Sequence, residues 1–277
     1  MKKHKPANRI EEYDLRARYC KDDYLMSGRG EYDTDYRINR IVDRLTLMPH
    51  FRVLDIGPGS GRLFELIHTR VSECHGVEPA DSIVERLSKK FDDVSNVQIH
   101  LAKSNRLHFD DDSFDIIVIN GVLNLLDTKE EAIETLQEIR RVANESAIIF
   151  VGEFPFAFEG PGQLQGNGLQ RTWRKIRQGN LQEVVGIGFR KLVQTTRYLL
   201  RIEPKIIPSH TGINIPEDEF FHICRTIGMD GTAERTRFKY EIAASRNDYI
   251  LRPATPLDPD TGLHSASDRF HSNQNSR

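Results

Sequence analysis

The sequence predicts an α/β fold with a largely parallel sheet, and three observations in the first half of the chain indicate it. An aliphatic run at 53–56 is followed by glycines at alternate positions and then by a segment with helical apolar spacing. Short apolar runs and helix-like segments continue to alternate up to residue 153, and an acidic residue, Glu78, ends the second apolar run. Such alternation is typical of βαβ units, whose strands lie parallel in one sheet.

Each further element follows from a local pattern. We expect strands at 53–56, 73–78, 97–101, 114–120 and 147–152, and helices at 81–91, 129–142 and 215–228. The run 114–120 has no charge after Asp115, so it should be a central strand covered on both faces. The helix at 129–142 places its apolar residues on one face. Residues 232–245 are expected to form a closing hairpin.

The glycine-rich turn after the first strand predicts a ligand site. Gly57, Gly59 and Gly61 permit a tight turn and let a ligand approach without meeting a Cβ. In open α/β sheets, ligands bind beyond the carboxyl ends of the strands, where this turn should lie. The dinucleotide pattern G-x-G-x-x-G is absent, because Arg62 occupies the place of its third glycine. Asp55 would repel a pyrophosphate but can pair with a ligand ammonium group, so the turn favours a cationic ligand.

Residues 53–61 read V-L-D-I-G-P-G-S-G, which resembles the first motif of the class I S-adenosylmethionine (SAM)-dependent methyltransferases. The segment 107–115, with its L-x-F-x-D-x-S-F-D pattern, resembles a second stretch of this family, and the resemblance covers residues 36–153 and, loosely, 212–246. It implies a Rossmann-like, seven-stranded, largely parallel sheet with helices on both faces, and SAM as the cofactor.

The resemblance also implies a set of cofactor-binding residues: Asp55, Gly57, Gly59, Gly61, Glu78, Ser104 and Asn120. Glu78 lies 17 positions beyond Gly61, where an acid can accept hydrogen bonds from both ribose hydroxyls. Lys103 stands where the family usually carries an acid that binds the adenine amino group. We therefore assign adenine recognition to the Ser104 hydroxyl and to backbone groups.

The composition divides the chain into five parts. We expect an N-terminal arm at 1–35, a SAM-binding core at 36–153, an inserted helical substrate cap at 154–211, the end of the core at 212–251 and a disordered tail at 252–277. In the family, such an arm lies over the cofactor pocket, and the substrate cap lies between the fifth strand and the last helix.

The inserted cap is basic. Residues 154–211 contain nine Lys and Arg against three Glu, a balance of +6, although the whole chain has a formal charge of −2. Arginine side chains match phosphate and carboxylate groups well, so the cap favours a small anionic acceptor. A solvated basic helix face is the alternative interpretation.

A methyl acceptor that is a hydroxyl or amine must lose a proton, so a general base can assist the transfer. The candidates are Glu153, at the end of the fifth strand, and His210, in the loop before the last helix; Tyr24 is less favoured. A loop histidine without a catalytic role is the alternative for His210.

The composition argues against several classes of protein and of binding site. The three cysteines are widely spaced and form no CxxC or Cys/His cluster, which predicts no metal site and a reducing, cytoplasmic location. No window approaches the roughly 18 apolar residues of a membrane span, and the N-terminus has no apolar core of a secretory signal. The small net charge gives no indication of nucleic acid as a partner.

The sequence thus predicts a SAM-dependent methyltransferase that acts on a small, anionic acceptor by O- or N-methylation. One alternative is an RNA-directed enzyme that uses the basic cap, but Trp173 and Tyr198 are isolated aromatics, and NGVL replaces the [DN]-P-P-[YF] motif of base methyltransferases. Another is a non-catalytic structural or regulatory protein, suggested by Lys103 and by Asn144-Glu145-Ser146 in place of the family's Pro-Gly-Gly. A dehydrogenase is the weakest alternative.

Overall fold

The structure, a computed structural model, describes residues 3–19, 31–155, 212–235 and 246–254, with a few isolated positions between 185 and 206. Its strands are β1 (Lys3–His4), β2 (Arg52–Ile56), β3 (Glu73–Glu78), β4 (Val97–Leu101), β5 (Phe114–Asn120), β6 (Ala143–Pro155), β7 (Lys205–Ile206), β8 (Met229–Arg235) and β9 (Arg246–Pro253). Its helices are α1 (Arg9–Tyr19), α3 (Glu31–Val42), α4 (Arg62–Ile67), α5 (Asp81–Lys90), α6 (Lys129–Val142) and α9 (Glu217–Thr226), with short 3₁₀ helices η1 (His68–Arg70) and η2 (Leu123–Leu125).

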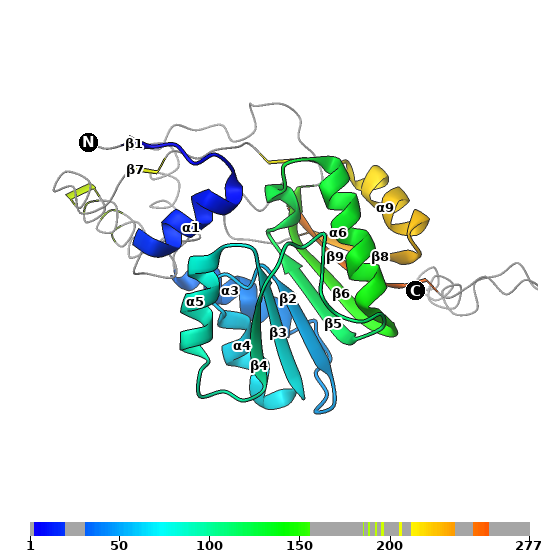
Figure 1. The fold of residues 1–277 in the computed structure, drawn as a ribbon. Coiled ribbons are helices and arrows are strands. Elements are labelled where there is room, and N and C mark those ends of the chain that lie inside the picture. The colour runs from blue at the N-terminus through cyan, green and yellow to red at the C-terminus, as the bar shows by residue number, and fades with distance from the viewer. Residues whose placement is uncertain are drawn as a thin grey trace, which may run out of the picture.

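The described residues form a seven-stranded sheet with the order β4-β3-β2-β5-β6-β9-β8 (Figure 1). Strands β2 to β6 pair in parallel, whereas β9 is antiparallel to both β6 and β8. This arrangement confirms the predicted fold class. The strand order reverses between β2 and β5, because the chain runs outward from β2 to β4 and then returns to the other side of β2. Ligands bind α/β sheets at such a switch point.

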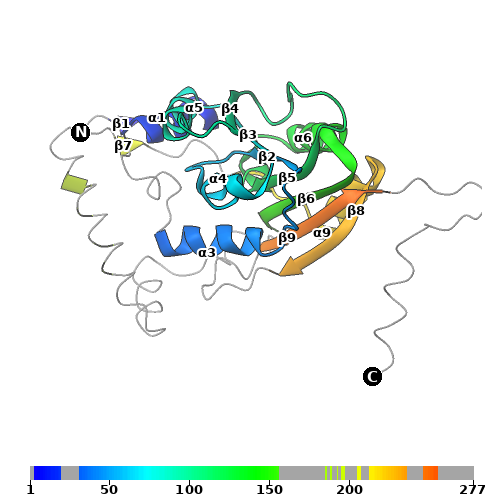
Figure 2. The ribbon, with the colours of Figure 1, turned by 90° about the horizontal axis from the view of Figure 1, so that it is seen from below.

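Two layers of helices cover the sheet. Helices α3, α4 and α5 lie on one face, and α6 and α9 on the other (Figures 1 and 2). Successive residues of a strand point to opposite faces. Val53 of β2 therefore packs in the hydrophobic core under α3, α4 and α5, and Leu54 packs in the core under α6 and α9. Helix α6 spans the predicted 129–142, and its N-cap Thr128 accepts a hydrogen bond from the Glu131 backbone N–H at 3.1 Å.

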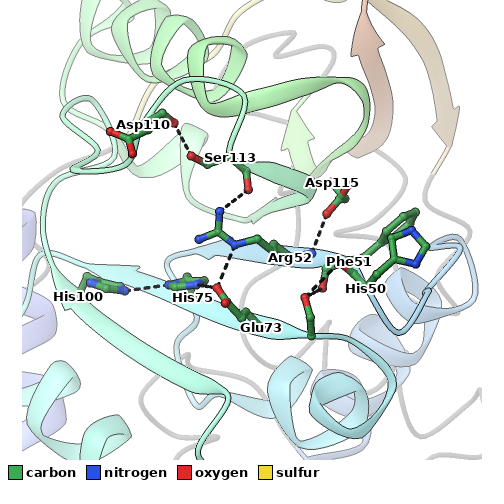
Figure 3. Close-up of polar contacts among 10 residues, drawn as sticks. His50, Phe51, Arg52, Glu73, His75, His100, Asp110, Ser113 and Asp115 are labelled. Atoms are coloured by element: carbon green, nitrogen blue, oxygen red, sulfur yellow. Dashed lines mark hydrogen bonds and ion pairs between the residues drawn. The ribbon is translucent and has the colours of Figure 1, made fainter.

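Polar contacts tie together the amino-terminal halves of the parallel strands (Figure 3). Arg52 of β2 donates from its backbone N–H to Asp115 of β5 at 2.7 Å and from its Nε to Glu73 of β3 at 2.9 Å. The imidazole of His75 bridges Glu73 and His100 of β4 at 2.8 and 3.1 Å. Hydrogen bonds from His75 and Arg52 lower the pKa of Glu73. Structural contacts thus occupy this part of the sheet, and the opposite, carboxyl-terminal edge carries the cavity described below.

Two ion pairs fix helix α3 to the last strands of the sheet, Arg37–Glu153 on β6 and Arg40–Asp248 on β9, and Arg44, just beyond the helix, pairs with Glu234 on β8. Glu153 has a φ of 59°, in the left-handed region that non-glycine residues seldom adopt. The register between β6 and β9 also shifts between Val151 and Phe154. The Glu153 side chain is 2% exposed, so the pair with Arg37 is a buried one.

Several boundaries differ from those predicted. Helix α3 begins at Glu31, within the predicted arm, and β9 continues to Pro253, past the predicted end of the core at 251. The closing hairpin pairs 229–235 with 246–253 rather than lying within 232–245, because the flanking residues also join the ladder. The cap, apart from its isolated positions, and the tail beyond 254 lie outside the described residues. No helix among the described residues is long and apolar enough to cross a membrane.

The buried ion pair at α3 gives a prediction about stability. Arg37→Met leaves the Glu153 carboxylate buried beside an apolar side chain, which should cost about 3–5 kcal/mol in the free energy of unfolding. The double variant Arg37→Met/Glu153→Gln removes both charges and should recover much of that loss. Urea denaturation of both variants measures the effect. An Arg37→Met protein within about 0.5 kcal/mol of wild type, as for an ordinary surface change, would contradict the assignment.

Candidate functional site

A cavity of about 390 Å³ lies where β2, β3 and β5 end. Six of the seven predicted cofactor residues line it: Asp55, Gly57, Gly59, Glu78, Ser104 and Asn120. They come from different strands, and the parallel sheet brings them together because its strands share one carboxyl-terminal edge. The seventh, Gly61, and the candidate base Glu153 are not part of the cavity wall.

The three glycines of the turn have positive φ but serve different purposes. A Cβ at Gly57 would collide with Val122 in the loop after β5, so this glycine permits a close approach of two segments. A Cβ at Gly59 would meet no atom within 4 Å, because this residue faces the open cavity. A Cβ at Gly61 would lie 2.6 Å from the Phe91 ring at the end of α5. The absence of a side chain at Gly61 thus makes room for close helix packing, and its assignment as a ligand contact stays a prediction.

Two buried carboxyl groups form the centre of the site. Asp55 is 5% exposed and Glu78 is 7% exposed. Burial, together with the nearby Glu78 charge, raises the pKa of Asp55 to about 7. Burial also raises the pKa of Glu78 to about 7, although the Ala80 backbone N–H donates a hydrogen bond to it at 3.2 Å. No residue in the described part of the chain donates a hydrogen bond to the Asp55 carboxylate. A ligand with cationic or hydroxyl donors would supply hydrogen bonds to both carboxyl groups.

The β4 end of the site shows how Lys103 and Ser104 are placed. The Ser104 hydroxyl is buried and lies 2.9 Å from the Thr135 hydroxyl of α6. Lys103 is exposed at the cavity wall and forms no ion pair with any residue that the structure describes. The hydrogen bond with Thr135 thus holds the Ser104 hydroxyl in place, and its assignment to adenine recognition stays a prediction. Lys103 places a positive charge beside it.

Asn120 ends β5 and is held against the next strand. A Cβ at Gly152 of β6 would collide with the Asn120 side chain, and the Gly121 backbone N–H donates to the Gly152 carbonyl at 2.9 Å. The absence of a side chain at Gly152 therefore makes room for Asn120 at the cavity.

The N-terminal segments complete the cavity wall. Helix α1 lies beside α5 (Figures 1 and 2), where Asp14 accepts a hydrogen bond from the Ser82 backbone N–H at 2.9 Å. It contributes Arg9 and Tyr13 to the cavity, and α3 contributes Thr34. The described residues of the N-terminal segments thus lie at the cavity. These residues carry no motif, so the sequence alone could not select them.

Of the candidate bases, only Glu153 lies among the described residues, and it is not part of the cavity wall. Glu153 pairs with Arg37 and has a left-handed backbone conformation. Its position gives no support to a role in proton transfer. His210 and Tyr24 lie outside the described residues, so the assignment of His210 stays a prediction. No group of three or more potential metal ligands occurs among the described residues.

Comparisons with known proteins agree with this geometry. Residues 54–151 match the family model of the methyltransferase domain. An uncharacterized protein of Methanocaldococcus jannaschii is 27% identical over 128 residues, a match that spans 44% of this chain and 57% of the relative. The chain thus aligns with little more than half the length of this curated relative.

Two solved structures share the fold at low identity. The YcgJ protein of Bacillus subtilis has a TM-score of 0.52 at 16% identity, covering 78% of this chain and 97% of its own. The phosphoethanolamine N-methyltransferase 1 of Haemonchus contortus, in complex with phosphoethanolamine and S-adenosylhomocysteine, has a TM-score of 0.59 at 12% identity, covering 88% of this chain and 48% of its own.

The different surroundings of two glycines give a matched pair of variants. Gly59→Ala should weaken SAM binding at least about tenfold, because its Cβ enters the cavity, while the fold bears a backbone strain of about 1 kcal/mol. Gly61→Ala should destabilise the fold by about 1–3 kcal/mol more, because its Cβ overlaps the Phe91 ring. Calorimetric titration and thermal unfolding measure the two effects. Equal SAM affinity in wild type and Gly59→Ala would remove the turn from the site.

The pKa values of Asp55 and Glu78 predict opposite pH dependences for folding and for binding. Both groups titrate near 7 in the folded protein but near their ordinary values, 3.8 and 4.5, when unfolded. Their contribution to the free energy of unfolding is therefore present below about pH 4 and is lost as the pH rises to about 7. SAM should bind the ionised forms, so its affinity should rise at least about tenfold from pH 6 to pH 8.

The control for this measurement is Glu73→Gln, which changes a carboxylate far from the cavity. It should leave the pH profile of SAM binding as in wild type, whereas Asp55→Asn should flatten it. A wild-type affinity that is constant from pH 6 to pH 8 would show that these carboxyl groups do not contact the cofactor.

Proposed function

We propose that this chain is a class I SAM-dependent methyltransferase that transfers a methyl group to a hydroxyl or amine of a small, anionic acceptor. Residues 54–151, which match the family model of the methyltransferase domain, support it. The observation that carries the proposal is the convergence of Asp55, Glu78 and the glycine turn on one cavity. These residues resemble the family's cofactor residues in type and in position, which favours an enzyme over a structural or regulatory relative.

The residues of the cavity fit SAM. The Asp55 carboxylate, which lacks a donor among the described residues, suits the amino group of the methionine part. Glu78 uses one oxygen for the Ala80 N–H and keeps acceptor capacity for the ribose hydroxyls. Gly59 leaves the turn open to the ligand. Bound SAM supplies a methyl group activated by a positively charged sulfur.

The main contribution of the chain to the reaction is to position the acceptor and the methyl group relative to each other. Methyl transfer is an in-line displacement, so its rate depends on how well the acceptor atom is aligned with the methyl group. Ile38 and Ile41 of α3, with Val122 and Leu126 after β5, give the cavity an apolar lining that excludes water. We assign removal of the acceptor proton to His210, which lies outside the described residues and precedes α9 in the sequence.

Three features support an anionic acceptor. The inserted segment 154–211 has a balance of +6. Lys103 adds a positive charge at the cavity wall that no described acid neutralises. A protein with the same fold, from Haemonchus contortus, was solved with phosphoethanolamine, an amine that carries a phosphate.

In keeping with a reducing, cytoplasmic setting, Cys74 and Cys224 are free, buried thiols.

The proposal predicts the behaviour of a triple variant. Arg171, Arg174 and Arg177 lie outside the described residues, and their spacing of three would bring them near one face if this segment formed a helix. Changing all three to Gln should raise the acceptor KM strongly while the SAM affinity stays unchanged, because their charges would meet the acceptor and not the cofactor. Steady-state kinetics on an acceptor found among phosphorylated and carboxylated metabolites measures this.

Controls separate the parts of the proposal. Wild type should bind SAM and not NAD in calorimetry, and a protein that binds neither would overturn the enzyme assignment. An acceptor that proves neutral, or a triple variant whose KM stays within about twofold of wild type, would show that the basic segment is an ordinary solvated surface.

A further inference from the structure

The cavity wall contains two buried side-chain oxygens that have no hydrogen-bond partner among the described residues. One is the Oγ1 of Thr34, in the first turn of α3, and the other is the Oδ1 of Asn124, in η2 after β5. Buried polar groups in proteins are nearly always paired, and leaving one unpaired is costly. Two such atoms in the wall of one cavity therefore indicate a ligand that supplies their partners.

Neighbouring polar groups of the cavity, in contrast to these two oxygens, have hydrogen-bond partners. The Ser104 hydroxyl is paired with Thr135 at 2.9 Å, and Glu78 accepts the Ala80 N–H at 3.2 Å. Asn124 itself is held in place, because its backbone carbonyl accepts the Ile213 N–H at 3.2 Å. The two unpaired oxygens thus belong to residues on well-packed segments.

Thr34 lies on α3, away from the predicted cofactor contacts at the ends of β2, β3 and β4, whereas Asn124 follows the predicted contact Asn120 by four residues, in η2 beyond the end of β5. Arg37 and Arg40 tie α3 to β6 and β9, and Thr34 lies one turn before Arg37. The ion pairs thus anchor the helix that carries Thr34 in the cavity wall. Asn124 follows β5, the strand next to β6.

We propose that Thr34 and Asn124 bind the methyl acceptor through its own N–H or O–H groups, an inference that rests on the proposed methyl transfer. An amide oxygen only accepts hydrogen bonds, so it selects a ligand with a donor. The acceptor is therefore an amine or an alcohol, and its anionic group binds elsewhere. In the transfer, the bond from sulfur to the methyl carbon breaks as a new N–C or O–C bond forms, and the sulfonium becomes a thioether. The acceptor proton leaves to a base or to water.

The first experiment needs no knowledge of the acceptor. Thr34→Val keeps the shape of the side chain and removes an unpaired hydroxyl, so it should not lower the melting temperature of the ligand-free protein. The matched control Thr135→Val removes a paired hydroxyl and should lower it. Thr34→Val should also leave the SAM dissociation constant within about twofold of wild type, because Thr34 would contact the acceptor. A fall in melting temperature like that of Thr135→Val, or SAM binding weakened more than about threefold, overturns the proposal.

The second experiment screens amines and alcohols, each with and without a phosphate or carboxylate, for methyl transfer from labelled SAM. Thr34→Val and Asn124→Ala should raise the KM of the accepted compound at least fivefold, whereas Thr34→Ser, which keeps the hydroxyl, should restore it. A panel in which no compound is used better by wild type than by Thr34→Val overturns the proposal. Failure of the proposed function has a different signature, because wild type would then fail to bind SAM in the calorimeter.

Discussion

The burial of two carboxyl groups at the carboxyl-terminal edge of the sheet is the constraint on which the site depends. Asp55 and Glu78 are each more than nine-tenths buried, and burial raises the pKa of each to about 7. A fold that needed only stability would place apolar side chains there, because a buried carboxylate without a partner is costly. The arrangement is favourable only when a ligand supplies the cation and the hydroxyl donors. The same property makes the folded state more stable at low pH and the cofactor complex stronger at high pH.

The remaining elements hold this cavity in shape from both ends of the sheet. Near the amino ends of the strands, Arg52, Glu73 and Asp115 join β2, β3 and β5, so the strand ends that carry Asp55 and Glu78 keep their relative positions. On the helical side, the buried Arg37–Glu153 pair fixes α3 to β6. Such a pair adds little net stability compared with an apolar contact, but it allows few alternative geometries. Its contribution is therefore to the position of the helix that lines the cavity.

Local sequence patterns were sufficient to predict the sheet, α6 and the positions of Asp55 and Glu78, because strand ends and glycine turns depend on neighbouring residues. The buried ion pair of Glu153 and the close packing at Gly61 could not be predicted, since each depends on a residue distant in the sequence. Glu153 meets Arg37, 116 positions earlier, and Gly61 meets the Phe91 ring across a helix interface. Thr34 and Asn124 belong to no motif, and only the three-dimensional arrangement shows that their oxygens are buried and have no hydrogen-bond partner in the part of the chain that the structure describes.

One cavity thus contains two sets of polar groups whose hydrogen-bonding capacity the described residues do not fill. Asp55 and Glu78 require positive charge and hydroxyl donors, whereas the oxygens of Thr34 and Asn124 require donors on a second ligand. If the two ligands occupy adjoining parts of one cavity, the bound cofactor becomes part of the wall that the acceptor meets. Cofactor binding should then precede tight acceptor binding, because an empty cofactor site leaves the acceptor surrounded by water. This order would expose the reactive methyl group to an aligned nucleophile while apolar residues of α3 exclude solvent, which is the condition that an in-line displacement requires.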